Sequence, residues 1–244
     1  ITIYYAFVLQ IIDFNLNYLI PRYTLWFLIT MFFYNMAEWI LEKISYKIMI
    51  TISIIIGLIV GFIPIIGSIL SLSRTFVFFP FYVLGYYAID LNLLSKIKSK
   101  QVKTITIILS IIILIVILEY NSILSIKILK GKYSYFDIDN VNIILACGER
   151  LLFYIVSIIV SITFLNLVPK KESMLTTLGR NTLYIYLSQG MILKTFVTEK
   201  ILLNNRIVGT LLLFLCAFIL TIVVTRIINK VQRYKKYKLE VIHG

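Results

Sequence analysis

Long apolar stretches, separated mostly by short polar segments, run through the whole chain. A helix that crosses a membrane needs about 20 predominantly apolar residues. Read for such stretches, the chain contains eight predicted spans, at about residues 1–12, 24–42, 47–62, 74–92, 104–120, 142–168, 181–197 and 208–228. The pattern therefore predicts an all-α fold, a polytopic bundle of transmembrane helices.

The basic residues between these spans alternate in number from one side to the other. One side holds Lys43, Lys47, Lys96, Lys98, Lys100, Lys103, Lys170, Lys171, Arg180, Arg226, Lys230, Arg233, Lys235, Lys236 and Lys238. The other side holds only Arg22, Lys127, Lys130, Lys132, Lys200 and Arg206. Because Lys and Arg accumulate in cytoplasmic loops, we expect a cytoplasmic C-terminus and a large outside loop at 121–141. The organisation predicted is a membrane domain at 1–228 and a basic cytoplasmic tail at 229–244.

Composition agrees with this assignment to a membrane. Of the 244 residues, 60% are hydrophobic and 14% are charged, with a mean hydropathy of +0.96. Soluble domains are typically about 25% charged, so a soluble enzyme and a disordered tail are excluded. The net charge of +13 is expected to face anionic membrane lipid, not nucleic acid. Two cysteines, Cys147 and Cys216, match no metal or disulfide spacing and are expected to be free thiols.

Polar residues within the predicted spans are the first candidates for function, because ionisable groups in hydrocarbon are costly unless paired or hydrated. Thr30, Tyr34 and Glu38 recur at helical spacing on one face of the second span. They line a polar cavity, or Glu38 lies at the membrane interface; the sequence leaves both open. Arg74, at the start of the fourth span, either holds an anionic group or extends to the outer headgroups.

Two further sets of polar residues leave similar alternatives. Glu149 and Arg150 are adjacent in the sixth span. They form either an internal catalytic pair or an interfacial ion pair. In the seventh span, Asn181 and Tyr184 share a face with Gln189 beside it, either as a functional stripe or as hydrogen bonds between helices. One loop contains four lysines, Lys96, Lys98, Lys100 and Lys103. They either bind the phosphates of a cofactor or are there because cytoplasmic loops accumulate basic residues.

Several chemistries have no support in the sequence. The chain contains no phosphate-binding loop, no zinc-binding spacing and no nucleophile elbow. We therefore expect no metal. The one histidine, His243, is the penultimate residue, which is no position for a membrane active site. Histidine is the residue that most often serves as a general acid or base near neutral pH.

Three motifs together resemble the acyltransferase 3 family of integral membrane acyltransferases. Leu25–Leu28 reads LWFL, and an SRT triplet that contains Arg74 leads into FFPFYVLGYY at 78–87. The most specific motif is LGRNTLYIYLSQG at 178–190. Within the family, the fucose 4-O-acetylase-like branch of bacteria is the most similar. The resemblance covers roughly residues 20–228.

The resemblance implies a fold of about ten helices around a polar cavity. It also implies transfer of an acyl group, usually acetyl from acetyl-CoA, to a hydroxyl of a cell-surface or exported polysaccharide or sugar. The chain would then lie in the bacterial plasma membrane. Family motifs fall on Trp26, Arg74, Asn181, Tyr184 and Tyr186, and Arg74 is then expected in the interior.

In that mechanism a base activates the acceptor hydroxyl for attack on the thioester carbonyl. Arg74, Arg150 and Gln189 would stabilise the oxyanion that develops. The four lysines of the 96–103 loop, together with Arg180, would hold the phosphates of the acyl-CoA donor.

The chain departs from the family pattern in two places. The family's first two helices carry a histidine, the expected general base, and nothing here corresponds to them; residue 1 falls about where the third family helix would begin. The late motif often ends in a histidine and glycine, whereas this chain has Gln189 and Gly190. Glutamine forms hydrogen bonds but does not transfer protons at neutral pH. We therefore expect an N-terminally truncated enzyme.

Two other classes remain open at this stage. A membrane transporter or flippase of lipid-linked glycans also carries intramembrane Arg and Glu. Many transporters contain paired repeats with broken helices at matching positions, and Pro80 has no such counterpart. A degenerate gene fragment without function is the third interpretation.

The missing histidine generates the first prediction. Expressed alone in membranes, these 244 residues are expected not to acetylate a glycan, because no residue here can serve as the expected base. The full-length gene product is expected to be active. Mass spectrometry of the surface glycan measures both; normal O-acetylation by the 244 residues alone would overturn the prediction.

Overall fold

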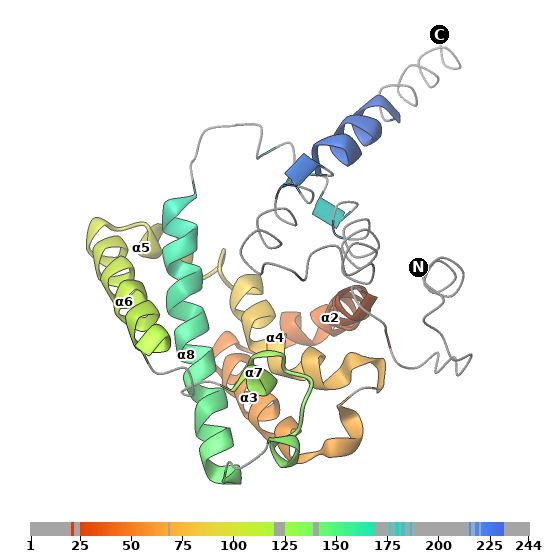
Figure 1. The fold of residues 1–244 in the computed structure, drawn as a ribbon, viewed down its shortest axis with the longest axis vertical. Helices are drawn as coiled ribbons and strands as arrows, with labels where there is room; N and C mark the ends of the chain where they lie inside the picture. The colour runs from red at the N-terminus through yellow and green to blue at the C-terminus, as the bar shows by residue number, and fades with distance from the viewer. Residues whose placement is uncertain are drawn as a thin grey trace, which may run out of the picture. The chain divides into compact units, whose positions relative to one another are not determined.

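The computed structural model describes residues 21, 25–67, 69–119, 125–138, 142–168, 176, 179–180, 182–183, 186, 215, 218–219 and 221–231. The chain divides into two compact units. The central unit consists of Tyr18–Pro21 and Trp26–Val168, and the terminal unit of Ile1–Asn17, Arg22–Leu25 and Pro169–Gly244. The described residues form helices and connections with no strand, as the all-α prediction requires (Figure 1).

Three helices open the central unit: α2 (Leu25–Lys43), α3 (Tyr46–Ile59) and α4 (Leu72–Tyr86). Helices α3 and α4 form the most extensive helix pair. Residues later in α2 contact residues later in α4 or just after it: Thr30 contacts Thr75, and Leu41 contacts Tyr87. Helices α2 and α4 therefore run parallel, which is what two spans separated by one other span must do.

The connection from α3 to α4 is a series of short 3₁₀ turns, η1 (Val60–Phe62), η2 (Pro64–Ile66) and η3 (Ile69–Ser71). Leu70 and Ser71 both adopt left-handed backbone conformations, with φ of 47° and 57°. Such conformations are costly for residues with a Cβ atom and persist only where the surroundings impose them. Helix α4 therefore begins directly after a strained turn, and Arg74 lies in its first turn.

Helix α4 ends earlier than the predicted span at 74–92. It stops at Tyr86, and hydrogen-bonded turns follow up to Asn92, whose φ is 50°. The hydroxyl of Tyr87 donates to the carbonyl of Leu41 at 2.7 Å and lies 2.9 Å from that of Ile44. This tertiary bond to the end of α2 holds Tyr87 where the apolar pattern alone favours another helical turn.

The second half of the central unit contains α5 (Leu93–Ile97), α6 (Lys100–Glu119), α7 (Ile126–Leu129), η4 (Tyr135–Asp137) and α8 (Ile143–Leu167). Helices α6 and α8 lie side by side (Figure 1). Ser110 and Thr163 share a 2.8 Å hydrogen bond, and Asn166 donates to the carbonyl of Ile97. Helix α4 begins at the end of the central unit that contains Arg74, called the arginine end. Helix α6 begins at the opposite end, which contains Lys96, Lys98, Lys100 and Lys103 and is called the lysine end.

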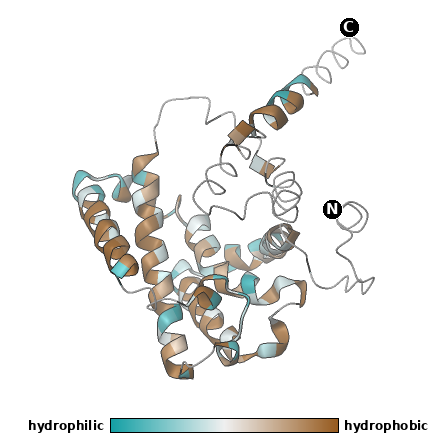
Figure 2. Ribbon diagram, in the orientation of Figure 1, coloured by the Kyte–Doolittle hydropathy of each residue, from teal (hydrophilic) through white to brown (hydrophobic). Residues whose placement is uncertain are grey.

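In the part of the chain that the structure describes, three helical stretches are long and apolar enough to cross a membrane: Ile69–Tyr86, Lys100–Glu119 and Ile143–Leu167. Tyr46–Phe62 is apolar but shorter. Most of helix α6 has hydrophobic colour in Figure 2, and most of its apolar side chains are exposed. Since soluble monomers rarely expose apolar patches of this extent, these helices point to a membrane protein. The predicted spans at 1–12 and 181–197 lie wholly or largely outside the described residues, and 208–228 does so in part.

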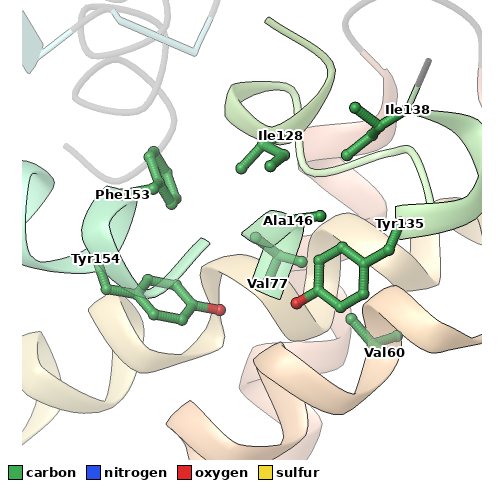
Figure 3. Close-up of a cluster of buried hydrophobic side chains, with 8 residues drawn as sticks. All are labelled: Val60, Val77, Ile128, Tyr135, Ile138, Ala146, Phe153 and Tyr154. Carbon is green, nitrogen blue, oxygen red and sulfur yellow. The ribbon is translucent and has the colours of Figure 1, made fainter. Parts of the chain in front are cut away.

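A cluster of buried hydrophobic side chains packs together the segments at the arginine end of the central unit (Figure 3). It consists of Val60, Val77, Ile128, Tyr135, Ile138, Ala146, Phe153 and Tyr154. These residues come from α3's extension, α4, the 125–138 segment and α8. The predicted outside loop at 121–141 is thus packed against the helices over its described part, 125–138. A second cluster, at the lysine end, is Leu41, Met49, Val83 and Tyr87.

Two glycines allow the close approach on which this cluster depends. Gly57 and Gly61 have the spacing of the small-residue motif that brings membrane helices together. A Cβ atom on Gly61 would overlap the ring of Tyr135 and lie 2.6 Å from Nη1 of Arg150. A Cβ atom on Gly57 would overlap the hydroxyl of Tyr154.

Replacing Gly61 with alanine is therefore expected to lower stability by about 1–3 kcal/mol, the usual cost of overpacking. The matched control is Gly148→Ala in α8, where a Cβ atom meets nothing within 4 Å. That change should be neutral or stabilising by up to about 1 kcal/mol, because alanine favours helix. Thermal unfolding in detergent compares the two; equal midpoints would contradict the packing described.

Candidate functional site

A ladder of polar contacts joins α2 to α4 in the central unit. The Thr30 hydroxyl lies 3.1 Å from that of Thr75, and the Tyr34 hydroxyl donates to the Thr75 carbonyl at 2.7 Å. Toward the lysine end, the Tyr82 hydroxyl donates to Oε1 of Glu38 at 2.6 Å. The rings of Tyr34 and Tyr82 stack at 4.6 Å. The polar face at 30, 34 and 38 thus faces α4, with Thr30 and Tyr34 buried and Glu38 half-buried.

Arg74 occupies the arginine end of this ladder. Its guanidinium lies over the indole ring of Trp26, 4.7 Å from the ring centroid, and Nε donates to the carbonyl of Lys130 at 3.2 Å. The neighbouring Ser73 hydroxyl donates to the carbonyl of Gly131 at 2.8 Å. Arg74 itself is partly exposed. Ring and carbonyl together orient the guanidinium of Arg74.

Arg150 is held quite differently, with no part of the side chain exposed. Its Nη1 and Nη2 donate to the carbonyls of Gly57 and Tyr133 at 3.4 and 3.1 Å. The guanidinium lies 4.5 Å from the ring centroid of Tyr135, and Nε has no hydrogen-bond partner. Among the described residues, no carboxylate pairs with Arg150. Breaking such contacts around a buried charge costs several kcal/mol.

Glu149 points elsewhere. Its Oε2 accepts a hydrogen bond from the backbone N–H of Ser125 at 3.2 Å, at the start of α7. Adjacent residues of a helix point about 100° apart, so Glu149 and Arg150 serve different neighbours. An ion pair between the two is therefore wrong, and a catalytic role for either residue stays a prediction.

Two tyrosines flank Arg150, and their hydroxyls point toward one another in Figure 3. The Tyr135 hydroxyl donates to the carbonyl of Leu58 at 2.9 Å, whereas the buried Tyr154 hydroxyl has no hydrogen-bond partner. Burial raises the pKa of Tyr135 above its ordinary value, although the charge of Arg150 opposes the shift. Tyr135 therefore stays protonated and acts as a hydrogen-bond donor.

A cavity of about 510 Å³ opens at the lysine end of the same unit. This inner cavity lies between the end of α4, α5, the start of α6 and the second half of α8. Its lining residues are Phe81, Leu84, Gly85, Ala88, Leu93, Leu94, Lys96, Ile97, Val102, Ile158, Ser161, Ile162 and Leu165. Of the four lysines singled out in the sequence, all are exposed and only Lys96 lines the cavity.

Comparison with known proteins decides the family. A family model described as an acyltransferase domain matches residues 1–230. The chain belongs to the acyltransferase 3 family. Acyltransferase membership and the apolar helices make it a membrane acyltransferase in general terms. A search of the curated proteins finds no match to this acyltransferase, and a search of solved structures finds none.

The late motif of the acyltransferase lies in the terminal unit. Asn181, Tyr184 and Gln189 are outside the described residues. Arg180 is helical and exposed, and Tyr186 is helical and half-buried. The assignment of these five positions to a site thus remains a prediction. Among the described residues, no three His, Cys, Asp or Glu side chains gather as a metal would require.

Several residues of this site were not singled out from the sequence. Tyr82 and Thr75 lie within the quoted motifs, yet their roles depend on facing Glu38 and Tyr34 from a separate helix. Tyr135 comes from a connection that the apolar pattern left unstructured. One usable signal was present, the Gly57–Gly61 spacing in an apolar segment, which marks the close helix contact.

The ladder generates a test by double-mutant cycle. Tyr82→Phe is expected to lower stability by about 1–3 kcal/mol, because it removes a hydrogen bond to a carboxylate within the bundle. Glu38→Leu removes the acceptor, so the double variant should lose less than the sum of the single losses. The cycle is measured by unfolding in detergent. Additive losses would mean that the two side chains do not interact.

Proposed function

We propose that the chain is a membrane-embedded O-acyltransferase that transfers an acyl group, in the first instance acetyl, from acyl-CoA to a hydroxyl of a cell-surface or exported polysaccharide or sugar. Family membership supports acyl transfer, and the exposed apolar helices support a membrane location. The resemblance to the fucose 4-O-acetylase-like branch supports the glycan acceptor, the acetyl donor and a bacterial plasma membrane. The distribution of Lys and Arg supports a C-terminus in the cytoplasm.

The reaction needs a group that stabilises negative charge on the former carbonyl oxygen. The acceptor oxygen forms a bond to the thioester carbon, and the carbon–sulfur bond breaks. The hydroxyl proton is taken up by a base, and CoA leaves as the thiol or thiolate. Positioned cations in a low-dielectric site stabilise the tetrahedral intermediate much more strongly than water does.

The observation that carries the proposal is the oriented guanidinium of Arg74. It is partly exposed and is held over Trp26 and against the Lys130 carbonyl, so its direction is set before a substrate arrives. Arg150 has no exposed surface. We therefore assign Arg74 to contact with the reacting groups and Arg150 to positioning, since it holds the Tyr133–Tyr135 segment against α3 and α8.

The donor is assigned to the other end of the central unit. Lys98, Lys100 and Lys103 are exposed around the α5–α6 turn, and such cations suit the phosphates of CoA. For Arg180, which is exposed in the terminal unit, binding to the phosphates stays a prediction from the sequence alone.

Deleting the gene tests the proposed function against transport. An acyltransferase predicts that the surface polysaccharide remains but loses its O-acetyl groups by mass spectrometry. A transporter or flippase predicts that the polysaccharide itself disappears from the surface, and this result would overturn the proposal.

The role of Arg74 is tested in the protein as its gene encodes it. Arg74→Lys keeps the charge but loses the planar fork of donors, and kcat/KM for acetyl transfer should fall about 10²-fold or more. The control is Lys47→Gln, which changes an exposed lysine at the start of α3. It should leave the rate unchanged. Equal rates for the two variants would remove Arg74 from the reaction.

A further inference from the structure

The inner cavity is almost entirely hydrocarbon. Of its lining side chains, only those of Lys96 and Ser161 are polar, and the rest of the wall is aliphatic, aromatic or glycine. Ligand cavities are commonly about 300–1,000 Å³, so 510 Å³ is ample for a bound molecule. A methylene group occupies roughly the 30 Å³ that a water takes in the liquid. The cavity can thus enclose a hydrocarbon chain of about ten carbons or more.

The segment that contributes Lys96 to the cavity is basic. Lys96 lies in its wall, and three more exposed lysines follow within the next seven residues. Asp90 is the only acidic residue between 87 and 103. Figure 2 shows the contrast, with hydrophilic colour at the α5–α6 turn and hydrophobic colour along α6 and α8. The ligand that fits therefore joins an apolar chain to a negative charge.

The distance between charge and chain decides between two such ligands. In an acyl-CoA, the long pantetheine arm separates the phosphates from the acyl chain. In a phospholipid, the phosphate is attached to the glycerol that carries the chains. Here Lys96 is part of the cavity wall itself, beside Leu94 and Ile97. We propose that the inner cavity binds an anionic phospholipid, with one chain enclosed and the phosphate at Lys96.

This site is separate from the donor site assigned above. It uses the lysine that lines the cavity, and its ligand comes from the surrounding membrane. Basic pockets between membrane helices on one face of the bilayer are suited to anionic headgroups. An enclosed chain would also cover apolar walls of α4, α5 and α8 that no described side chain fills.

Filling the cavity tests the enclosed chain. Gly85 lines it, and a Cβ atom there meets nothing within 4 Å, so Gly85→Leu begins its added bulk in open space. Gly148→Leu is the matched control, because Gly148 is equally unobstructed in a helix and lies outside the cavity. Each buried methylene is worth about fourfold in affinity, so Gly85→Leu should reduce retained lipid at least tenfold.

The measurement is native mass spectrometry of the full chain released from nanodiscs that contain equal phosphatidylglycerol and phosphatidylcholine with matched chains. The unaltered chain and Gly148→Leu should retain phosphatidylglycerol preferentially. Lys96→Gln should reduce this preference about fivefold, the effect of one basic residue at an anionic surface. Lys96→Arg should restore it. Ser161→Phe, which fills the cavity from α8, replaces Gly85→Leu if that variant does not fold.

Three results would overturn the inference. Equal lipid retention by Gly85→Leu, Ser161→Phe and Gly148→Leu would show that no chain enters the cavity. An unchanged preference in Lys96→Gln would remove the charge from the site. Displacement of phosphatidylglycerol by added palmitoyl-CoA in the unaltered chain, with palmitoyl-CoA itself then retained there but not by Gly85→Leu, would assign the cavity to the donor.

Discussion

The central unit is organised around the compensation of one buried charge. Arg150 has no exposed surface and no described carboxylate beside it. Two backbone carbonyls and the ring of Tyr135 take the place of water. They belong to α3 and to the segment before α8, so satisfying one guanidinium fixes three parts of the chain together. The arrangement also requires glycine at 61, because a larger side chain would occupy the space of the guanidinium and the ring.

The same constraint governs the contacts of α2 with α4. Hydrocarbon offers no hydrogen bonds, so polar groups within membrane helices must find partners in the protein. Thr30, Tyr34 and Glu38 do so on the residues of α4 that face them. These bonds set the parallel register of the two helices. At one end of that register, the same pairing brings Trp26 under Arg74.

Opposite ends of the unit carry opposite chemical features. The arginine end presents an oriented guanidinium beside a packed connection, and the lysine end presents exposed ammonium groups around an apolar cavity. A membrane acyltransferase that takes its donor from one side and its acceptor from the other needs such a division. The proposed lipid site adds a structural role for the membrane at the lysine end. Both proposals depend on the placement of charge relative to hydrocarbon.

The sequence by itself determined the class, the family and the long helices of the central unit. Apolar stretches of sufficient length permit only helices in a bilayer, since their backbone groups must bond internally. The motif around Arg74 and the late motif at 178–190 carried the resemblance, and the family model that matches residues 1–230 confirmed the family. Only the tertiary structure decided that Arg150 is buried, that Glu149 bonds to α7, and that α4 stops at Tyr86. Each of these outcomes depends on a partner distant in sequence, and apolar periodicity contains no information about such partners.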